Sequence, residues 1–279
     1  MSLDQITVHQ PTVEGFGQEW AAFDQQALSE PERETLFRGY FSIVPKHVLH
    51  SQAVCADLGC GSGRWASLVA PQVGHLHLVD ASVQALNIAR DALANRTNVS
   101  FEASDLAESK IEDGSLDFAY SLGVLHHVPD TAAAIERLAK KIKPGGGFLV
   151  YLYYRFDDRA TWFRWAWAAS DLVRRLVSRM PFGLRRAVCD AIAAAVYWPL
   201  ARAAALIGRR QASSWPLAFY ARRSFYVMRT DALDRFGTRL ERRFTRPEIE
   251  GMLRESGFRE IRFSPEAPFW VCYAVKGQA

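Results

Sequence analysis

Short apolar runs alternate with amphipathic stretches between residues 51 and 154. The runs end in polar or glycine-rich turns, and the stretches between them carry apolar residues at helical spacing. This alternation predicts an α/β fold in which helices cover both faces of a mainly parallel sheet. Residues 244–279 add one helix and a pair of strands. The expected strands are 54–57, 76–79, 99–102, a run ending at Ser121, a run ending at Tyr153, 260–264 and 269–276.

The chain before residue 51 predicts helices that precede this sheet. Residues 1–14 show no clear period and are expected to form a loose lead-in. Residues 14–48 carry aromatic and leucine side chains at helical spacing, and Ser29 with Pro31 predicts a helix start. The expected division is an N-terminal helical segment (1–50), a core (51–154 and 244–279) and a helical insert (155–243).

Three glycines spaced by two follow the first predicted strand. Gly59, Gly61 and Gly63 suit a tight turn before a helix, where the main chain meets a ligand closely. The dinucleotide-binding pattern requires a third glycine where this chain has Arg64, and no Gly-Lys-Ser/Thr follows to make a Walker loop. The turn therefore disfavours a nicotinamide oxidoreductase and a phosphate-cradling loop.

The segment from Asp57 to Gly63 resembles the first motif of the class I S-adenosylmethionine-dependent methyltransferases. Later regions follow in the family's order: Asp80 after the second strand, residues 103–106, residues 122–130 and Lys-Pro-Gly-Gly at 143–146. The resemblance implies a doubly wound seven-stranded sheet of order 3-2-1-4-5-7-6, with the last strand antiparallel. It places S-adenosyl-L-methionine at the carboxyl ends of strands one, two and four, with S-adenosyl-L-homocysteine as the product.

The resemblance also implies which residues hold the cofactor. Asp80 would accept hydrogen bonds from the ribose hydroxyls, with a role as a helix cap as the alternative. Asp105 would lie near the adenine amino group, and the N-terminal segment would cover the cofactor. The implied cofactor-binding residues are Asp57, Gly59, Cys60, Gly61, Gly63, Asp80, Ala81, Ser82, Ser104, Asp105, Leu106, Ser121, Leu122 and Trp20.

Methyl transfer is an in-line displacement that needs alignment and a dry site, and an oxygen nucleophile gains from a base. Histidine suits that role near neutral pH, and His126 and His127 follow the fourth strand. The alternatives are that the pair orients its loop or contacts the cofactor through its backbone. Candidate substrate contacts are Phe16, Tyr151, Tyr153, Tyr154 and Arg155, and Phe16 has core packing as its alternative.

The insert has a charge pattern of its own. Residues 155–243 hold 18 arginines, no lysine and seven acidic residues, whereas the whole chain has a net charge of only +4. Two predicted helices, 160–179 and 184–207 with a kink near Pro199, interleave arginine with apolar residues. Three interpretations remain open: a lid over a hydrophobic or anionic substrate, a homodimerisation arm, and a basic amphipathic surface on an anionic membrane.

The remaining composition narrows the class of partner. The four cysteines show no CxxC pair, and no metal-ligand spacing is visible, so we expect buried thiols and activity in the presence of a chelator. No secretory signal is visible and no uncharged run reaches about 18 residues, which predicts a cytoplasmic protein with at most a peripheral membrane contact. Arginines interleaved with apolar residues disfavour nucleic acid as a partner.

The expected function is methyl transfer to an oxygen of a small or lipid-linked acceptor. The chain lacks an Asn/Asp-Pro-Pro-Tyr/Phe motif after the fourth strand, which disfavours methylation of adenine or glutamine amino groups. The alternative is a non-catalytic partner protein or membrane-surface binder that keeps the fold and acts through the basic insert.

Overall fold

The computed structural model describes residues 9–23, 28–157, 159–207, 215, 217–265 and 270–278. The chain divides into two compact units. The first comprises residues 1–24, 35–157 and 240–279, and the second comprises residues 25–34 and 158–239. Part of the expected N-terminal segment, residues 25–34, thus belongs to the second unit, and helix α2 (Glu30–Phe41) is divided between the two.

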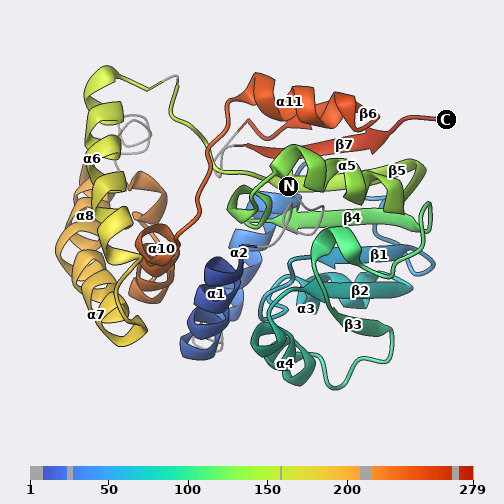
Figure 1. Cartoon of the computed structure of the whole chain (residues 1–279), viewed down its shortest axis with the longest axis horizontal. Coiled ribbons are helices and arrows are strands. Elements are labelled where there is room, and N and C mark those ends of the chain that lie inside the picture. The colour runs from blue at the N-terminus through green and yellow to red at the C-terminus, as the bar shows by residue number, and fades with distance from the viewer. Residues whose placement is uncertain are drawn as a thin grey trace. The chain divides into compact units, whose positions relative to one another are not determined.

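The first unit is built on a seven-stranded sheet of order β3-β2-β1-β4-β5-β7-β6, which confirms the predicted topology (Figure 1). Neighbouring strands are parallel except for β7, which runs antiparallel to β5 and β6. The carboxyl ends of β1, β2 and β4 therefore lie at one edge, where open α/β sheets bind ligands. The strands are β1 (Val54–Leu58), β2 (His75–Asp80), β3 (Val99–Ala103), β4 (Leu116–Leu122), β5 (Ile142–Tyr151), β6 (Phe258–Phe263) and β7 (Val271–Lys276).

Helices of the first unit begin where the sequence supplies caps. Ser82 Oγ accepts a hydrogen bond from Ala85 N at the start of α4, and Asp130 does the same for α5. Thr245 and Glu248 form a reciprocal capping box ahead of α11, which satisfies two otherwise unpaired backbone donors. The helices are α1 (Gln10–Ala22), α3 (Ala66–Val69), α4 (Val83–Ala92), α5 (Thr131–Lys141) and α11 (Arg246–Glu255).

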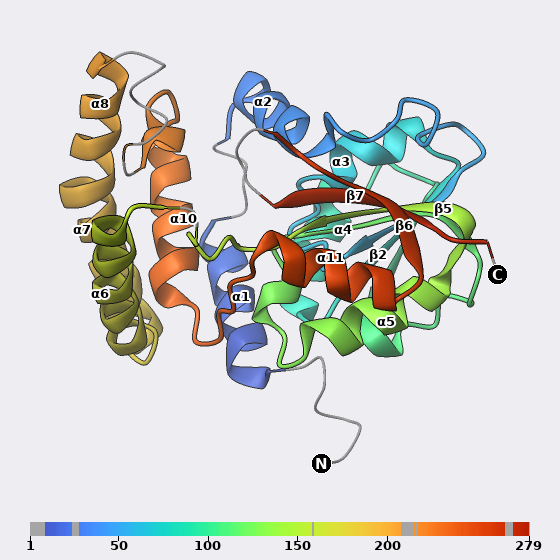
Figure 2. The same cartoon turned by 90° about the horizontal axis from the view of Figure 1, so that it is seen from above.

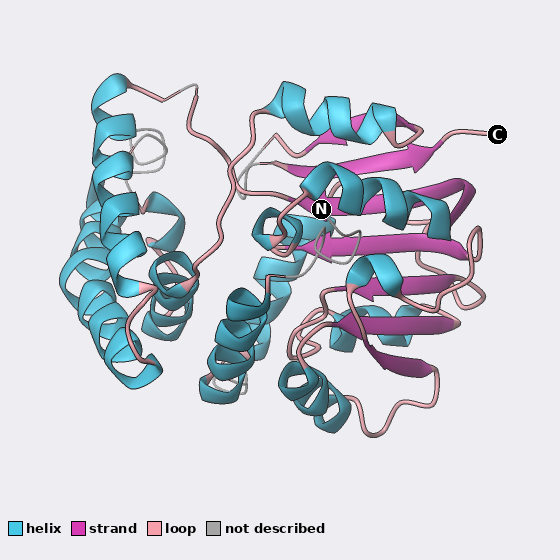
Figure 3. Cartoon of the chain, in the orientation of Figure 1, coloured by secondary structure: helices cyan, strands magenta, loops and turns pink. Residues whose placement is uncertain are grey.

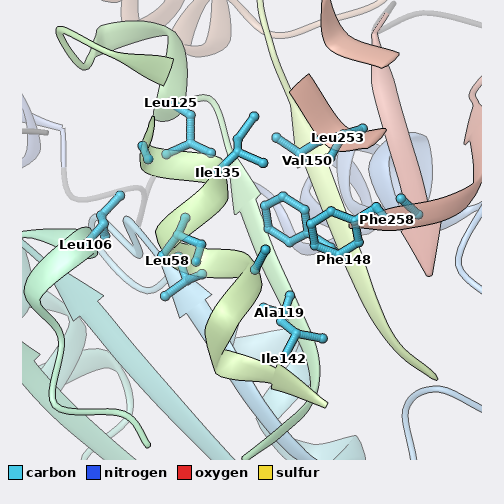
Figure 4. Close-up of a cluster of buried hydrophobic side chains, with 14 of the residues drawn as sticks. Leu58, Leu106, Ala119, Leu125, Ile135, Ile142, Phe148, Val150, Leu253 and Phe258 are labelled. Atoms are coloured by element: carbon cyan, nitrogen blue, oxygen red, sulfur yellow. The ribbon is translucent and has the colours of Figure 1, made fainter. Parts of the chain in front are cut away.

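Helices lie on both faces of the sheet (Figure 3). On one face, Ile135 and Leu138 of α5 and Leu253 of α11 join a buried cluster with Phe148 and Phe258, whose rings stack at 5.4 Å (Figure 4). On the other face, the Phe41 ring meets Phe118 and Tyr120 of β4 at 6.4 and 5.3 Å. Alternate residues of β4 thus face opposite sides of the sheet, which explains the consecutive apolar residues Phe118, Ala119 and Tyr120 in this strand.

Several element boundaries differ from those predicted. Helix α1 begins at Gln10, inside the expected lead-in, with a proline in its first turn. The helix expected from residue 63 begins only at Ala66, because Gly63 has φ +75° and belongs to the turn. Strand β5 begins at Ile142, and it ends at Tyr151 rather than Tyr153. The expected strand 269–276 begins at Val271, and Phe269 lies outside the described residues.

The second unit is helical. Helix α10 packs against α6 and α7 (Figure 2). A π turn at Ala193–Tyr197 precedes Pro199, whose ring and missing N–H cannot follow a regular α-helix, so the irregularity expected near Pro199 lies one turn earlier. The polar segment 208–214, expected to end the second helix of the insert, lies outside the described residues. The elements are α6 (Thr161–Val177), α7 (Phe182–Ile192), the π turn, α8 (Trp198–Ile207), a 3-10 turn (Ala218–Tyr220) and α10 (Phe225–Gly237).

One helix of the part of the chain that the structure describes, Phe182–Leu206, is long and apolar enough to cross a membrane by length and composition alone. Only 28% of its most apolar window is buried. The sequence argument required an uncharged run and so did not single out this segment, because Arg185, Arg186, Asp190 and Arg202 interrupt it.

A buried carboxylate joins the helices of the second unit. Asp171 of α6 accepts hydrogen bonds from Arg174 Nε at 2.7 Å and Arg175 Nε at 3.0 Å, and Arg235 of α10 lies 3.8 Å away. Arg174 also donates to the carbonyls of Thr238 and Arg239, which follow α10. Burial alone would raise the pKa of Asp171, but these guanidinium groups hold it below its usual value.

We expect Asp171→Ala to lower the free energy of unfolding by about 3 kcal/mol, because it leaves the buried Arg174 without its counter-charge. Chemical denaturation near pH 7 measures this loss. The depressed pKa means that the stabilisation is present above the unfolded-state pKa, about 4, and is lost as pH falls through the folded value. The difference between wild type and variant should therefore shrink in acid.

Asp113→Ala is the matched control. Asp113 forms an exposed ion pair with Lys141 at 2.9 Å, and such pairs contribute less than about 1 kcal/mol. Equal losses for the two variants would show that Asp171 does not have the central role inferred here.

Candidate active site

The glycine turn after β1 requires glycine at all three positions. Gly59, Gly61 and Gly63 have φ of +85°, +53° and +75°, in the left-handed region that favours glycine. A Cβ at Gly59 would lie 2.5 Å from Val124, and one at Gly61 would lie 2.9 Å from the Trp20 ring. The backbone of the turn can therefore contact a ligand at the carboxyl end of β1 directly.

Asp80 ties this turn to the next one. Its Oδ2 accepts a hydrogen bond from Gly61 N at 2.8 Å, and its Oδ1 accepts one from Ser82 N at 2.8 Å. Burial raises the pKa of Asp80, and these two hydrogen bonds lower it in part. The helix-cap alternative does not hold for this residue, because Ser82 and not Asp80 caps α4. Ala81 and Ser82 form the turn directly beside the glycines.

Asp57, Cys60 and Ser121 lie beneath the turn. Burial raises the pKa of Asp57 to about 8, the nearby Tyr120 hydroxyl lowers it in part, and Asp80 adds to the increase. Cys60 is buried and its N–H donates to the Val79 carbonyl at 3.1 Å. Ser121 Oγ donates to the Leu58 carbonyl at 2.8 Å, so its side chain joins β4 to β1. The Ser121 hydroxyl thus supports the strand that leads into the turn, the Cys60 backbone joins the turn to β2, and Leu122 ends β4.

The residues after β3 approach the same edge. Ser104 N donates to the Asp80 carbonyl at 3.2 Å, and Asp105 opens a short 3-10 turn by accepting from Glu108 N. The Leu106 side chain is buried in the core cluster, so only its backbone can face a ligand. The structure thus brings Ser104 and Asp105 to the end of β2, as the resemblance implies for an adenine site.

The buried polar atoms of this edge fit an adenosyl ligand. Among the described residues, Asp57 Oδ2, Ser62 Oγ and Ser104 Oγ are buried without a hydrogen-bond partner. Buried polar atoms without partners are costly, and an occupied site would satisfy them. Together with the glycine turn, they provide donors and acceptors along the carboxyl ends of β1 and β3.

Helix α1 lies against the N-terminus of α4. A Cβ at Gly17 would come within 2.9 Å of Ser82 Oγ, so the two helices approach closely at that point. One turn later Trp20 contacts Gly61, and Phe16 lies 5.0 Å from His127 between ring centroids. This helix therefore reaches both the glycine turn and the histidine pair.

The histidine pair follows β4 and is fully buried. His127 Nδ1 lies 2.7 Å from the Leu240 carbonyl and so donates a proton to it, which leaves Nε2 as the acceptor of the neutral ring. The His126 ring stacks on Tyr153 at 3.6 Å. Burial, His127 and Arg243 together hold the pKa of His126 well below its usual range, so His126 is neutral at pH 7.

Of the predicted substrate contacts, the structure brings Phe16, Tyr151 and Tyr153 to the histidine pair. The Tyr154 ring packs instead on Trp270 at 5.0 Å. Arg155 forms an ion pair with Glu248 at 2.8 Å and donates to the Arg243 carbonyl. Both positions follow the end of β5, where side chains no longer point consistently to one face.

The sequence reasoning missed three residues of this region. Tyr40 lies 5.3 Å from Tyr151, Arg243 lies 5.0 Å above the Tyr153 ring, and Leu240 orients His127 through its carbonyl. Tyr40 carried a signal, as an aromatic residue of the N-terminal segment. Leu240 and Arg243 carried none, because they are more than 80 residues from their partners in sequence.

In the part of the chain that the structure describes, no group of three His, Cys, Asp or Glu residues could hold a metal ion. The four cysteines are buried and none forms a disulfide.

Comparison with known proteins identifies the family. A methyltransferase domain model matches residues 55–146, the segment that carries the turn, Asp80 and the histidine pair. Phosphoethanolamine N-methyltransferase 2 of Caenorhabditis elegans is 35% identical over 100 residues, 35% of this chain and 23% of that protein. The ubiquinone biosynthesis O-methyltransferase of Paraburkholderia xenovorans is 32% identical over 93 residues, 32% of this chain and 40% of that protein.

Residues 55–146 form a methyltransferase domain of the class I S-adenosylmethionine-dependent type. The similarity of the chain to these two curated relatives spans less than half of their length. Phosphoethanolamine N-methyltransferase 2 of Haemonchus contortus, solved with S-adenosyl-L-methionine, shares the fold with a TM-score of 0.51 and 16% identity. That likeness covers 92% of this chain and 44% of the Haemonchus chain. Bound S-adenosyl-L-methionine supplies a methyl group on a positively charged sulfur.

We expect Gly61→Ala to abolish binding of S-adenosyl-L-homocysteine by this methyltransferase. A Cβ there forces either the turn or Trp20 to move and adds about 1–2 kcal/mol of backbone strain. Isothermal titration and the shift in melting temperature with added S-adenosyl-L-homocysteine measure the loss.

Gly114→Ala separates strain from contact. Gly114 also has a left-handed φ, +66°, but a Cβ there would meet nothing within 4 Å. This variant should lose similar stability and bind S-adenosyl-L-homocysteine normally. Unchanged binding by Gly61→Ala would place the cofactor away from the glycine turn.

Proposed function

We propose that this methyltransferase transfers the methyl group to an oxygen of a small or lipid-linked acceptor, with His127 as the general base. The orientation of His127 carries the proposal. Its Nδ1–H is held by the Leu240 carbonyl, so its Nε2 can accept the proton that a hydroxyl nucleophile loses. The neutral His126 beside it adds no positive charge that would compete for the nucleophile.

Aromatic rings surround this base and would exclude water from it. Phe16 contacts His127, and Tyr153 lies against both histidines, at 3.6 and 5.6 Å. Tyr40 and Tyr151 extend the group from α2 and β5. Such a wall favours a flat or apolar acceptor, and a dry site strengthens the proton transfer.

An amine acceptor is the second candidate. Aromatic faces attract ammonium groups, and one relative methylates phosphoethanolamine by its name. The other relative named above is an O-methyltransferase, so the relatives support both chemistries. A base at His127 is compatible with either acceptor, but a hydroxyl depends on it more.

A screen with radiolabelled S-adenosyl-L-methionine tests the proposal. Cell extract separated into lipid, saccharide, small-molecule and protein fractions is the acceptor source, and mass spectrometry of the purified labelled product distinguishes O-methyl from N-methyl products. We expect label in a small-molecule or lipid fraction on oxygen. Stabilisation by S-adenosyl-L-homocysteine without any labelled fraction would instead support a non-catalytic partner.

On the acceptor found, His127→Gln should lower kcat by about 10²–10⁴-fold, the usual contribution of a general base, with cofactor binding unchanged. The acid limb of the kcat/KM profile should disappear in the variant, a result that a merely structural role would not give.

His50→Gln is the control, since His50 is exposed and distant in sequence from the pair. Wild-type turnover by His127→Gln would remove the general base from the mechanism.

A further inference from the structure

Helix α6 exposes a continuous apolar stripe. Among its exposed residues, Trp162, Trp165 and Leu172 are 59%, 72% and 62% accessible, and Leu176 is 63% accessible. With 100° per residue, the stripe covers about 120° of the helix and extends about 21 Å along it. Its members are Trp162, Trp165, Ala166, Ala169, Leu172, Val173 and Leu176.

The opposite face of α6 packs against the rest of the unit, so the exposed stripe is not the core-facing side of this helix. Asp171 and Arg174 lie on that face and are held by α10 and the residues after it. Arginines border the stripe on one side: Arg164, Arg175 and Arg179 are exposed. This combination of tryptophan and leucine beside arginine is typical of helices that lie in a membrane interface.

The neighbouring helix repeats the pattern. Along Phe182–Leu206, Leu184, Val196, Trp198 and Leu206 are all exposed, Leu206 to 88%. Exposed apolar area on this scale marks a surface that contacts something apolar. We call the α6 stripe the apolar face of the second unit, and these residues add exposed apolar area to the same unit.

The charged residues of the second unit indicate which kind of apolar partner this surface suits. Residues 158–239 hold 15 arginines, five aspartates and no glutamate. The four described aspartates of this range, Asp171, Asp190, Asp231 and Asp234, are each buried or half-buried. The described exposed charges of residues 158–239 are therefore all positive, and exposed acidic residues of the unit, Glu30 and Glu34, come from its N-terminal part. The positive surface of residues 158–239 complements anionic lipid and would repel a second copy of itself.

Side-chain hydrogen bonds hold the Phe182–Leu206 helix on the unit, which opposes its crossing a bilayer. Asp190 makes two hydrogen bonds with Arg229 of α10, at 2.7 and 2.6 Å. Arg185 is buried and donates to the Gly237 carbonyl, and Arg202 donates to the Ala221 carbonyl. Spanning would move these charged groups into hydrocarbon at high cost.

We propose that the apolar face of the second unit docks on the surface of a bilayer rich in anionic phospholipid. The tryptophan and leucine side chains enter the interface, and the bordering arginines meet the headgroups. The inference goes beyond the proposed function and stands without it, because docking needs neither the cofactor nor an identified acceptor.

Flotation of the full chain with vesicles tests the proposal. Wild type should float with vesicles of phosphatidylcholine and phosphatidylglycerol at 7:3, and more weakly with phosphatidylcholine alone or in 0.5 M salt. Trp165→Ser with Leu172→Ser should reduce partitioning about tenfold or more, since two large apolar side chains no longer leave water.

Three controls distinguish membrane docking from other causes of altered flotation. Val83→Ser changes an exposed apolar residue of the first unit, 56% accessible, and should float like wild type. Circular dichroism melting and stabilisation by S-adenosyl-L-homocysteine should not change in the double variant, because both residues are exposed. Arg164→Gln with Arg179→Gln should lose only the preference for anionic vesicles.

Absence of flotation with anionic vesicles would overturn the proposal, as would equal flotation of the double variant. Light scattering supplies the remaining outcome. A wild-type dimer that the double variant converts to a monomer, without vesicle binding by either, would assign the face to self-association instead.

Discussion

The carboxylate of Asp80 is the interaction on which the candidate active site depends. It holds the backbone of the glycine turn through Gly61 and the start of the next turn through Ser82. Two loops from different strands are thus fixed by one side chain at the edge of a parallel sheet. Because β1 and β2 are adjacent and parallel, the two loops are neighbours, and one short acid can reach both.

A second set of links organises the acceptor side of the site. The chain leaves the core after Tyr154 and returns at Leu240, and Tyr154 pairs with Phe244 where the two passages meet. The returning segment then contacts the loop after β4: Leu240 accepts from His127, and Arg242 N donates to the His126 carbonyl at 2.9 Å. The insert therefore fixes the histidine pair through the residues that bring it back to the core.

Local signals made much of the fold predictable from the sequence. The apolar runs located most of the strands and helices, because each run depends on neighbours along the chain, and the resemblance to class I methyltransferases implied the sheet order that the structure shows. The same resemblance pointed to Asp80 at the end of β2 and to the other residues of the cofactor side. The boundaries were less accurate, since Gly63 belongs to the turn and α1 begins before its expected start.

The acceptor side could not be derived in the same way. Arg243 lies over Tyr153 and Leu240 orients His127, and both contacts close loops of about ninety residues or more. Hydrophobic periodicity along the chain carries no information about contacts between residues so far apart in sequence. Tyr154 and Arg155 seemed equivalent to Tyr153 in the sequence, yet packing on Trp270 and pairing with Glu248 engage them elsewhere. Side chains beyond the end of a strand lose the alternation that would have separated them.

A count of charges along the sequence does not show where in the insert the charged groups lie. Many of its arginines act inside the unit: Arg174 and Arg185 donate to carbonyls at the end of α10, and Arg229 pairs with Asp190. Guanidinium groups suit this work because they bridge a carboxylate and carbonyls in one plane. The net charge of the insert is thus partly a property of its interior. The same pairing removes aspartates from the surface, however, so the remaining exposed arginines have few opposing charges among the described residues. The insert contains many arginines and few aspartates. This one composition explains both the arginine hydrogen bonds inside the unit and the positive charge on its exposed surface.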